Sequence, residues 1–486
     1  MIEPTIYELS QPGRQGFKFP AVDVPTTPLP NEFIRDNLHF PELSELDVVR
    51  HFTNLSKLNF HIDGGFYPLG SCTMKYNPKI NEVATRLPGF ANTHPFQPIE
   101  TVQGNLYVMH QLQEWLQEIS GFNRVCLTPA AGAHGELVGA MIIKKYHAHN
   151  NDEKRVKILI PDSAHGTNPA TSSMSGFKVK PLPSDARGNV DIELLKVECD
   201  DTLAGLMLTN PSTLGLYDEN VVEVIQLVHE AGGLVYGDGA NLNALLGVER
   251  PGDVGFDIMH FNLHKTFSTP HGGGGPGSGP VGVSKELSEF LPGPIVTIVE
   301  DGDEDTPPFY GFHWPEKSIG RMKAFYGHFG VLIRAFTYIA MLGSDGIRNV
   351  AEKAVLNANY LMKFFKEDYP LPYDRSCMHE FVVEGSLPDA PGIHALDISK
   401  RLMDYGFHPP TNYFPLIVHE ALMIEPTETE SKQTLDAFAK AMQAIAKEAR
   451  EQPELLQNAP HSTPVRRCDE VKAARDLVLC CWIPED

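Results

Sequence analysis

The sequence predicts an α/β protein with a mainly parallel central sheet, a smaller C-terminal α+β domain and an N-terminal arm. Between residues 101 and 335, short apolar runs alternate with helical stretches, a pattern typical of parallel strands joined by helical crossovers. The first hundred residues are instead rich in proline and glycine. Near residue 300 an acidic, proline-rich segment separates the apolar runs from a long helical zone.

These changes predict four parts of the chain. We expect an arm that covers the active site at 1–100, a large domain at 101–335, a small domain at 336–450 and an extended tail at 451–486. In the large domain, ligands should gather at the carboxyl ends of the strands. The expected strands are 156–160, 203–208, 234–236, 258–263 and 280–283, and the expected helices are 106–119, 136–147, 221–233 and 319–342.

The arm should contain neither a sheet nor a long helix. Proline removes backbone donors and restricts the residue before it, and segments such as TTPLPNEF and LPGFANTHPFQP contain it repeatedly. The arm nevertheless keeps many large apolar residues, so we expect it to cover another protein surface.

Composition excludes several classes of partner. The formal net charge is −22 and no basic stripe is visible, which argues against nucleic acid. No run approaches the roughly 20 apolar residues of a membrane helix, and the N-terminus lacks the pattern of a signal peptide. We therefore expect a cytoplasmic protein that does not bind a membrane.

The seven cysteines are scattered and form no C-x-x-C pair, so we expect free thiols, no redox dithiol and no metal site. Cys480 and Cys481 lie in an apolar stretch, where packing is the expected role.

Two residues at strand ends are candidates for catalysis, and one of them, Lys265, for covalent chemistry. Lys265 follows an apolar strand and precedes a glycine-rich loop at 272–275. A buried lysine there can have a lowered amine pKa and react with a carbonyl, although most strand-end lysines are simply solvated. The glycine run can equally be a turn or a flexible lid, and no G-K-[ST] follows it. Asp238 ends the preceding strand; alone it would be read as a helix N-cap.

Three further segments end or follow strands. His165 in DSAHGTNPA could stack on a cofactor ring or be a turn residue, and Ser212 and Thr213 offer hydroxyl donors. The small residues Ala131-Gly132-Ala133 begin a helix, where backbone N–H groups and the helix dipole can hold a phosphate. Each signal is weak alone.

Together the segments predict a pyridoxal 5′-phosphate (PLP) enzyme with the cofactor covalently held on Lys265. They follow the order phosphate loop, stacking histidine, hydroxyl turn, aspartate and lysine, all at strand ends. A carboxylate at Asp238 would keep the pyridine nitrogen protonated, so that the ring accepts electrons. We assign Lys265, Asp238 and His165 as catalytic. The cofactor-binding residues are Ala131, Gly132, Ala133, His165, Thr213, Asp238, His264 and Lys265.

The chain also resembles a known family over nearly its whole length. The segments YPLGSCTMKYNPK, HPFQP, TPAAGAHGE, DSAHGTNPA, YGDGANLNA, NLHKTF and GFHPPTNYFPLIVHEALMIEPTETESK are similar to those of the glycine decarboxylases (P-proteins) of the glycine cleavage system. In particular, it looks like the PLP-lysine-bearing, C-terminal-half subunit of the two-subunit form.

The resemblance implies an aminotransferase-like fold of type I and the PLP roles given above for Lys265, Asp238 and His165. It implies decarboxylation of glycine, release of CO2, and transfer of the aminomethyl group to the lipoyl group of H-protein. It also implies a homologous partner subunit that lacks the lysine, in an α2β2 assembly. Ser71, Cys72, His94, His264 and His271 are candidates for substrate contact without assigned roles, and a packed Cys72 thiol is favoured over a nucleophile.

Two other functions remain open on the residues alone. One is another fold-type-I activity, such as an amino-acid decarboxylase or a desulfurase, the latter requiring a mobile cysteine near the site. The other is a non-catalytic subunit that supports an active partner, although such a chain would have no reason to keep Lys265.

Overall fold

The computed structural model describes residues 3–36, 38–271 and 277–479. Contacts divide the chain into two compact units, one comprising Met1–Gly65 with Asn458–Asp486 and the other Phe66–Gln457. The glycine run at 272–275 and the Cys480–Cys481 pair lie outside the described residues. The four-part division expected from the sequence stays a prediction.

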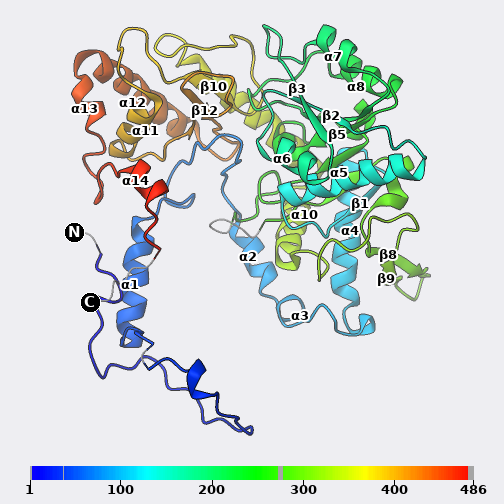
Figure 1. Cartoon of the computed structure of the whole chain (residues 1–486), viewed down its shortest axis with the longest axis horizontal. Helices are drawn as coiled ribbons and strands as arrows, with labels where there is room; N and C mark the ends of the chain where they lie inside the picture. The colour runs from blue at the N-terminus through cyan, green and yellow to red at the C-terminus, as the bar shows by residue number, and fades with distance from the viewer. Residues whose placement is uncertain (1–2, 37, 272–276, 480–486) are drawn as a thin grey trace. The chain divides into compact units, whose positions relative to one another are not determined.

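A seven-stranded sheet forms the centre of the described part of the larger unit (Figure 1). The strand order is β1-β7-β6-β5-β4-β2-β3, and β7 is antiparallel to both neighbours while the other pairs are parallel. The bounds are β1 Arg124–Cys126, β2 Lys157–Pro161, β3 Lys178–Leu182, β4 Leu203–Thr209, β5 Leu234–Asp238, β6 Ile258–His260 and β7 Val281–Val283.

All five expected strands are present, within one to three residues of the expected ends. The sixth strand, β6, stops at His260 and not at residue 263. Two edge strands, β1 and β3, were missed. β1 has only three residues, and β3 exposes most of its side chains, so neither gives an apolar run.

Helices cover both faces of the sheet. Val138, Ile142 and Ile143 of α5 pack in one core with residues of β2, β5 and β7. On the other face, α4, α8 and α10 pack against alternate residues of the same strands in a second core. The helices of this part are α2 Lys79–Thr85, α3 Pro88–Ala91, α4 Gln103–Ser120, α5 Gly132–His149, α6 Thr167–Met174, α7 Ile192–Glu198, α8 Val221–Glu230 and α9 Pro251–Val254.

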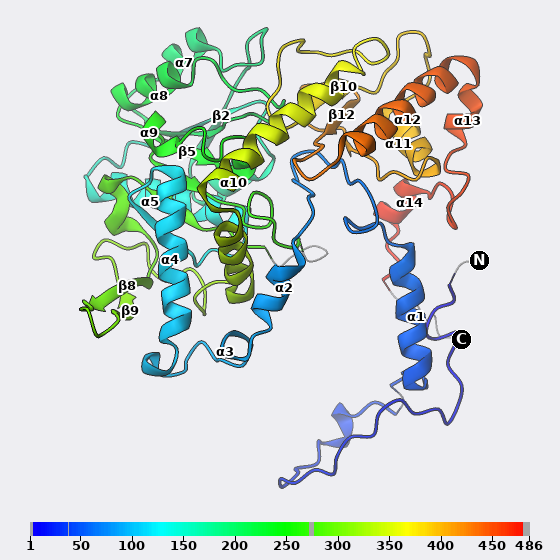
Figure 2. The same ribbon diagram turned by 180° about the vertical axis from the view of Figure 1, so that it is seen from behind.

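The long helix α10, Phe329–Lys363, joins this region to the C-terminal part of the unit. It begins ten residues later than expected, since residues 319–328 form bends and loops. Its direction changes at Gly343, which has a φ of 63° (Figure 2). By length and composition α10 could span a membrane. Its buried side chains, however, pack into two protein cores, as in a core helix of a folded domain.

The C-terminal part is an α+β layer with its own core. Strands β10 (Phe381–Glu384), β12 (Ala421–Ile424) and β11 (Thr411–Asn412) form an antiparallel sheet in that order. Helices α11 (Ala395–Asp404), α12 (Lys432–Glu451) and α13 (Pro453–Gln457) pack on it. The remaining elements of the unit are the hairpin β8 Ile295–Glu300 and β9 Phe309–His313, and the 3-10 helices η2 Ile99–Thr101, η3 Gly239–Ala244 and η4 Lys285–Phe290.

The smaller unit corrects one expectation about the arm. It contains the 14-residue helix α1, Glu45–Leu58, which begins at a capping box between Ser44 and Asp47. His51 is its one buried residue among those described, so α1 leaves most of its apolar side chains exposed. Helix α14 (Glu470–Arg475) and the 3-10 helix η1 (Asn31–Phe33) belong to the same unit. No strand occurs in the described residues before Arg124, as expected.

Candidate active site

A cavity of about 240 Å³ opens at the carboxyl ends of the central strands. The structure brings together all eight residues predicted to bind a cofactor: Ala131, Gly132, Ala133, His165, Thr213, Asp238, His264 and Lys265. Ser71, a candidate for substrate contact, lines the same cavity. Seven of the eight lie in segments that follow β1, β2, β4 and β6, and Asp238 is the last residue of β5, because parallel strands deliver their carboxyl ends and following loops to one edge.

The N-terminus of α5 forms one end of the cavity. Ala131 precedes the helix and no side chain caps it, so backbone N–H groups of the first turn face the cavity. A Cβ atom on Gly132 would come within 2.7 Å of Asn262 Oδ1, which is why glycine is needed there. An 18-residue helix with free N–H groups suits a phosphate.

Asp238 is a buried, ionised carboxylate at the end of β5. Its Oδ1 accepts a hydrogen bond from the Ala240 N–H at 2.9 Å, and its Oδ2 accepts one from Asn168 Nδ2 at 3.2 Å. Burial works to raise the pKa of Asp238, but His260, Lys265 and these hydrogen bonds together hold the pKa below its usual value. The site therefore provides a fixed, buried negative charge at the wall of the cavity.

His260 supports Asp238, and the sequence reading missed it. It is the last residue of β6; its Nε2 lies 3.4 Å from Asp238 Oδ1, and its Nδ1 lies 2.6 Å from the Tyr236 hydroxyl. All three side chains are buried. The available signal was a histidine within an apolar run. Because the predicted strand extended to residue 263, His260 was placed in the middle of that strand and not at its end.

His165 lies at the exposed side of the cavity. Its Nδ1 is 2.8 Å from Thr167 Oγ1, which donates to Glu136 Oε1 at 2.6 Å. The ring also packs edge-on to Phe414, with centroids 5.7 Å apart. These contacts fix the imidazole in one orientation, as a ring that stacks on a planar group requires.

Lys265 is flanked by neutral imidazoles. Burial, with the nearby charges of His271 and Lys265, lowers the pKa of His264 to about 3. Burial and Lys265 likewise lower the pKa of His271 to about 4. The two rings meet edge to face at 5.2 Å. At neutral pH both rings are therefore uncharged.

Two buried polar atoms of the lining await a partner within the described residues. Thr209 Oγ1 and Asn262 Oδ1 have no hydrogen bond there, although both residues line the cavity. Buried polar atoms are normally satisfied. A ligand with several polar groups, such as PLP, fits a cavity that combines these atoms with a helix N-terminus, a carboxylate and a lysine.

Cys72 lies beside the site but is not a reactive thiolate. Burial raises its pKa to about 11, although the positive charge of Lys265 works in the opposite direction. This favours the packed thiol over the nucleophile. Within the described residues, the cysteines at 72, 126, 199, 377 and 468 are free thiols, as expected.

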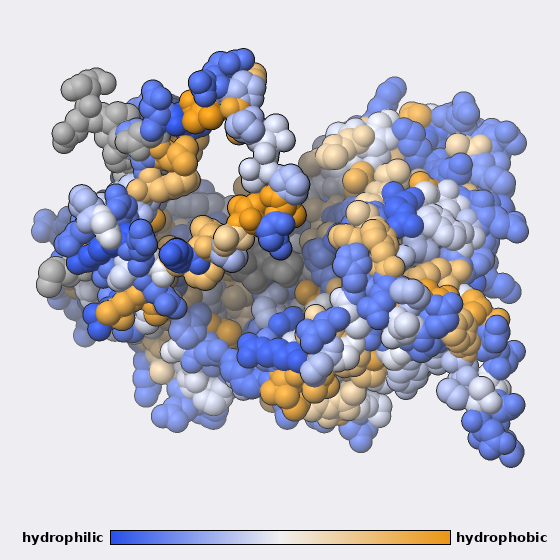
Figure 3. Space-filling model, turned by 90° about the horizontal axis from the view of Figure 1, so that it is seen from below, coloured by the Kyte–Doolittle hydropathy of each residue, from blue (hydrophilic) through white to orange (hydrophobic). Residues whose placement is uncertain are grey.

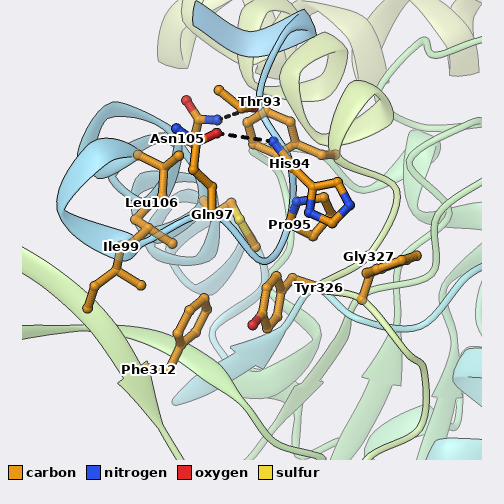
Figure 4. A pocket seen from close by; sticks show the side chains of 14 residues that line it. Thr93, His94, Pro95, Gln97, Ile99, Asn105, Leu106, Phe312, Tyr326 and Gly327 are labelled. Carbon is orange, nitrogen blue, oxygen red and sulfur yellow. Dashed lines mark hydrogen bonds between the residues drawn. The ribbon is translucent and has the colours of Figure 1, made fainter.

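Two of the residues singled out in the sequence lie elsewhere. His94 lines a separate cavity of about 110 Å³, together with Phe312, Phe325 and Tyr326 (Figure 4). Its backbone N–H contacts Gln97 Oε1 at 3.4 Å, so the HPFQP segment folds back on itself. Ser212 lines a small neighbouring cavity and caps a turn at Leu214 N.

Comparisons with known proteins agree with this architecture. Residues 350–463 match the family model of the glycine dehydrogenase C-terminal domain. A solved glycine decarboxylase (P-protein) of the glycine cleavage system, in inhibitor-bound form, superposes with a TM-score of 0.72 at 20% identity, covering 86% of this chain and 93% of that one. A glutamate decarboxylase from Lactobacillus brevis gives a TM-score of 0.63 at 14% identity, covering 90% and 96%. These matches confirm the predicted fold of PLP-dependent enzymes of type I.

A sequence relative extends the match to the whole chain. The probable glycine dehydrogenase (decarboxylating) subunit 2 of Caldanaerobacter subterraneus subsp. tengcongensis is 58% identical over 479 residues, which is 98% of each chain. The chain therefore belongs to the glycine dehydrogenase (decarboxylating) subunit 2 family of enzymes, as the resemblance of its segments implied.

Proposed function

We propose that the chain binds PLP in the cavity at the carboxyl edge of the sheet, covalently on Lys265. The backbone of Ala131–Ala133 binds the phosphate, and His165 packs on the ring. Asp238 holds a proton on the pyridine nitrogen. The single observation that carries this assignment is the convergence of Lys265 and a buried, ionised Asp238 on one cavity. Bound PLP supplies a sink for the electrons that are left when a bond to the substrate carbon breaks.

The reaction is the decarboxylation of glycine with transfer of its aminomethyl group to the lipoyl group of H-protein. In the overall reaction, the C–C bond of glycine breaks and CO2 leaves. The remaining electron pair forms a C–S bond, while the lipoyl disulfide is reduced and its second sulfur takes a proton. Asp238 stabilises the developing charge by keeping the proton on the ring nitrogen, and Lys265 is free to accept or return a proton once the substrate has replaced it.

Rival functions have less support from the site. A desulfurase would need a reactive cysteine next to the cofactor, whereas burial raises the pKa of Cys72 to about 11. A purely supporting subunit would need neither Lys265 nor the ionised Asp238.

The chain works with a second subunit, and the words "subunit 2" in the names of its relatives support this. The partner is a homologous chain without the lysine, in an α2β2 assembly with an obligate interface above ~2,000 Å². H-protein docks transiently, and the assembly is cytoplasmic. Exposed aromatic side chains in the smaller unit, among them Phe17, Phe19 and Phe40 at 73–82% exposure, need such a cover. Hydrophobic patches are visible among hydrophilic ones on the face in Figure 3.

The test begins with the purified chain and its partner subunit. A visible absorbance band that changes on titration with glycine is expected. Borohydride reduction and peptide mapping should then label the NLHKTF peptide, and Lys265→Ala should lose both the band and the label. With lipoylated H-protein present, the complex should exchange CO2 into glycine. A label on another lysine would refute the covalent assignment, and full exchange by this chain alone would refute the heteromer.

A further inference from the structure

A turn with an unusual backbone forms part of the cavity wall. Ser71 and Thr73 have φ values of 60° and 48°, in the left-handed region that side chains other than glycine rarely adopt. Ser71 lines the cavity that contains Lys265. We refer to residues 71–73 as the Ser71–Thr73 turn. Something must hold these two strained residues, one on each side of Cys72, in place, since nothing in their own chemistry favours this backbone.

Two buried carboxylates bind the turn. Glu425 Oε2 accepts a hydrogen bond from the Thr73 N–H at 2.7 Å, and its Oε1 accepts one from Thr73 Oγ1 at 2.6 Å. Glu380 Oε2 accepts one from the Ser71 N–H at 2.6 Å. Both glutamates are fully buried. They flank strands β12 and β10 of the C-terminal part, so this part of the chain reaches the active site through them.

The two carboxylates lie too close together for both to be charged without a counterion. One carboxylate oxygen of Glu380, one of Glu425 and one ring nitrogen of His379 all lie within 4.8 Å of one another. His379 is no counterion, because burial and the charges of Lys265 and Lys75 lower its pKa to about 3. Burial raises the pKa of each glutamate, and Glu425 raises that of Glu380 further; the charge of Lys265 lowers both values but offsets only part of the rise. One proton between them therefore satisfies the pair. Above about pH 7 Glu425 is the better-placed anion, because both of its oxygens accept short hydrogen bonds from Thr73, whereas Glu380 Oε1 accepts only a 3.4 Å hydrogen bond from Asn241 Nδ2.

The other residues that line the cavity indicate what the Ser71–Thr73 turn does. No arginine lines it in the described residues, so the usual bidentate partner of a carboxylate is missing from this chain's part of the wall. A neutral hydroxyl can orient a substrate carboxylate without the strong charge pairing that would resist its departure as CO2.

We propose that Glu380 and Glu425 are positioning residues that share one proton and hold the Ser71–Thr73 turn, so that the Ser71 hydroxyl faces the carboxylate of the substrate. The substrate identity rests on the proposed function. The hold on the turn does not, because it is a property of the folded chain.

Cys72 provides a reporter within the turn. It lies between the two strained residues and is largely buried, so release of the turn should increase its reaction with iodoacetamide. The rate is measured by peptide mapping in the complex with the partner subunit, at one pH. We expect Glu425→Gln to increase it about tenfold, because the amide has only one acceptor for the two Thr73 donors. Glu380→Gln should stay within about twofold of the wild type, because an amide resembles a protonated carboxyl.

Two further variants keep the test decisive if Glu425→Gln folds poorly. Thr73→Val removes one bond to Glu425 while keeping the side-chain shape, and should raise Cys72 reactivity in the same direction. Glu384→Gln, at the last residue of the strand that follows Glu380 but without contact to the turn in the described residues, is the matched control and should leave the reactivity unchanged.

Kinetics separate positioning from general damage. Ser71→Ala and Glu425→Gln should raise the KM for glycine about tenfold or more, while the cofactor spectrum stays that of the wild type. Unchanged Cys72 reactivity in Glu425→Gln and Thr73→Val would overturn the hold on the turn, whatever the activity. A released turn with an unchanged KM would overturn the role of Ser71. Wild-type protein without glycine-dependent exchange would refute the proposed function instead.

Discussion

Asp238 Oδ1 lies 3.4 Å from His260 Nε2, and both side chains are buried. The Tyr236 hydroxyl, 2.6 Å from His260 Nδ1, fixes the other side of the imidazole. The ring cannot rotate without breaking this contact, so the orientation of the Asp238 carboxylate depends on residues of two neighbouring strands. This arrangement is the basis of the first two predictions.

Asp238→Asn should keep the fold and much of the PLP binding but lose activity by a factor of about 10²–10³. A neutral amide cannot hold the proton on a pyridine nitrogen, so the developing negative charge loses its stabilisation. The measurement is kcat for glycine–CO2 exchange at saturating PLP. Asp253→Asn, at an exposed position, is the control. Activity within a few-fold of the wild type would show that Asp238 only caps η3.

Tyr236→Phe tests the support behind Asp238. The change removes one hydroxyl from a fully buried ring and leaves His260 Nδ1 without this partner. We expect a loss of about 1–3 kcal/mol in the free energy of unfolding and a several-fold fall in kcat. Denaturant unfolding and exchange kinetics measure the two effects. If both values stay at the wild-type level, His260 is held by its packing alone.

The buried glutamates predict a pH dependence of stability. Burial, partly offset by hydrogen bonds from Thr73 and the charge of Lys265, raises the pKa of Glu425 from 4.5 to about 7. The folded chain therefore binds more protons than the unfolded chain between these values. The contribution of protonated Glu425 to the stability of the fold is fully present below about pH 4.5 and is lost as the pH rises through about 7.

This dependence can be isolated by mutation. The charged or titratable groups that act on Glu425 include Glu380, Glu428 and Lys265, with the neutral His379 beside it. We expect Tm to fall between pH 5 and 8 by more in the wild type than in Glu425→Gln. The corresponding loss in the free energy of unfolding is about 1.4 kcal/mol for each unit by which the pKa differs between the folded and unfolded chains. Equal slopes in both proteins would show that Glu425 is not protonated in this range.

The exposed face of α1 predicts where the partner binds. Leu46, Val49 and Phe52 are 53–55% exposed on successive turns of this helix. Phe52→Asp should therefore fold and load PLP normally but weaken assembly with the second subunit. Native mass spectrometry of the co-expressed chains measures this, and Thr53→Asp, at an exposed polar position, is the control. Normal assembly of Phe52→Asp would place the interface elsewhere.

The sequence predicted the central sheet well because its strands are continuous apolar runs. The loops after these strands could be located for the same reason, and with them Lys265, Asp238 and His165. The edge strand β3 was missed, since its sequence KVKPL has two lysines and a proline among five residues and gives no apolar run. Helix α1 was missed because proline and glycine dominate the composition around it, although Ser44 and Asp47 form an ordinary capping box.

The residues that support the site, His260, Glu380 and Glu425, could not be predicted from apolar runs in the sequence. His260 is separated from Asp238 by 22 positions, and the two meet only because β5 and β6 are neighbours in the sheet. Glu380 and Glu425 flank strands of a different sheet from the rest of the site, so their contact with Ser71 and Thr73 depends on how two layers pack. No local pattern in the sequence encodes that packing.

The contact between Glu380 and the Ser71 N–H joins residues 309 positions apart in the chain. During synthesis at about 5–20 residues per second, Ser71 leaves the ribosome roughly 15–60 seconds before Glu380. In the last part of that interval, after β5, β6 and Lys265 have emerged, the central strands can already associate, but this wall of the cavity has no anchor. A nascent chain could thus hold the cofactor loosely before it can hold a substrate, and premature termination anywhere before β12 would yield a protein unable to complete its catalytic pocket.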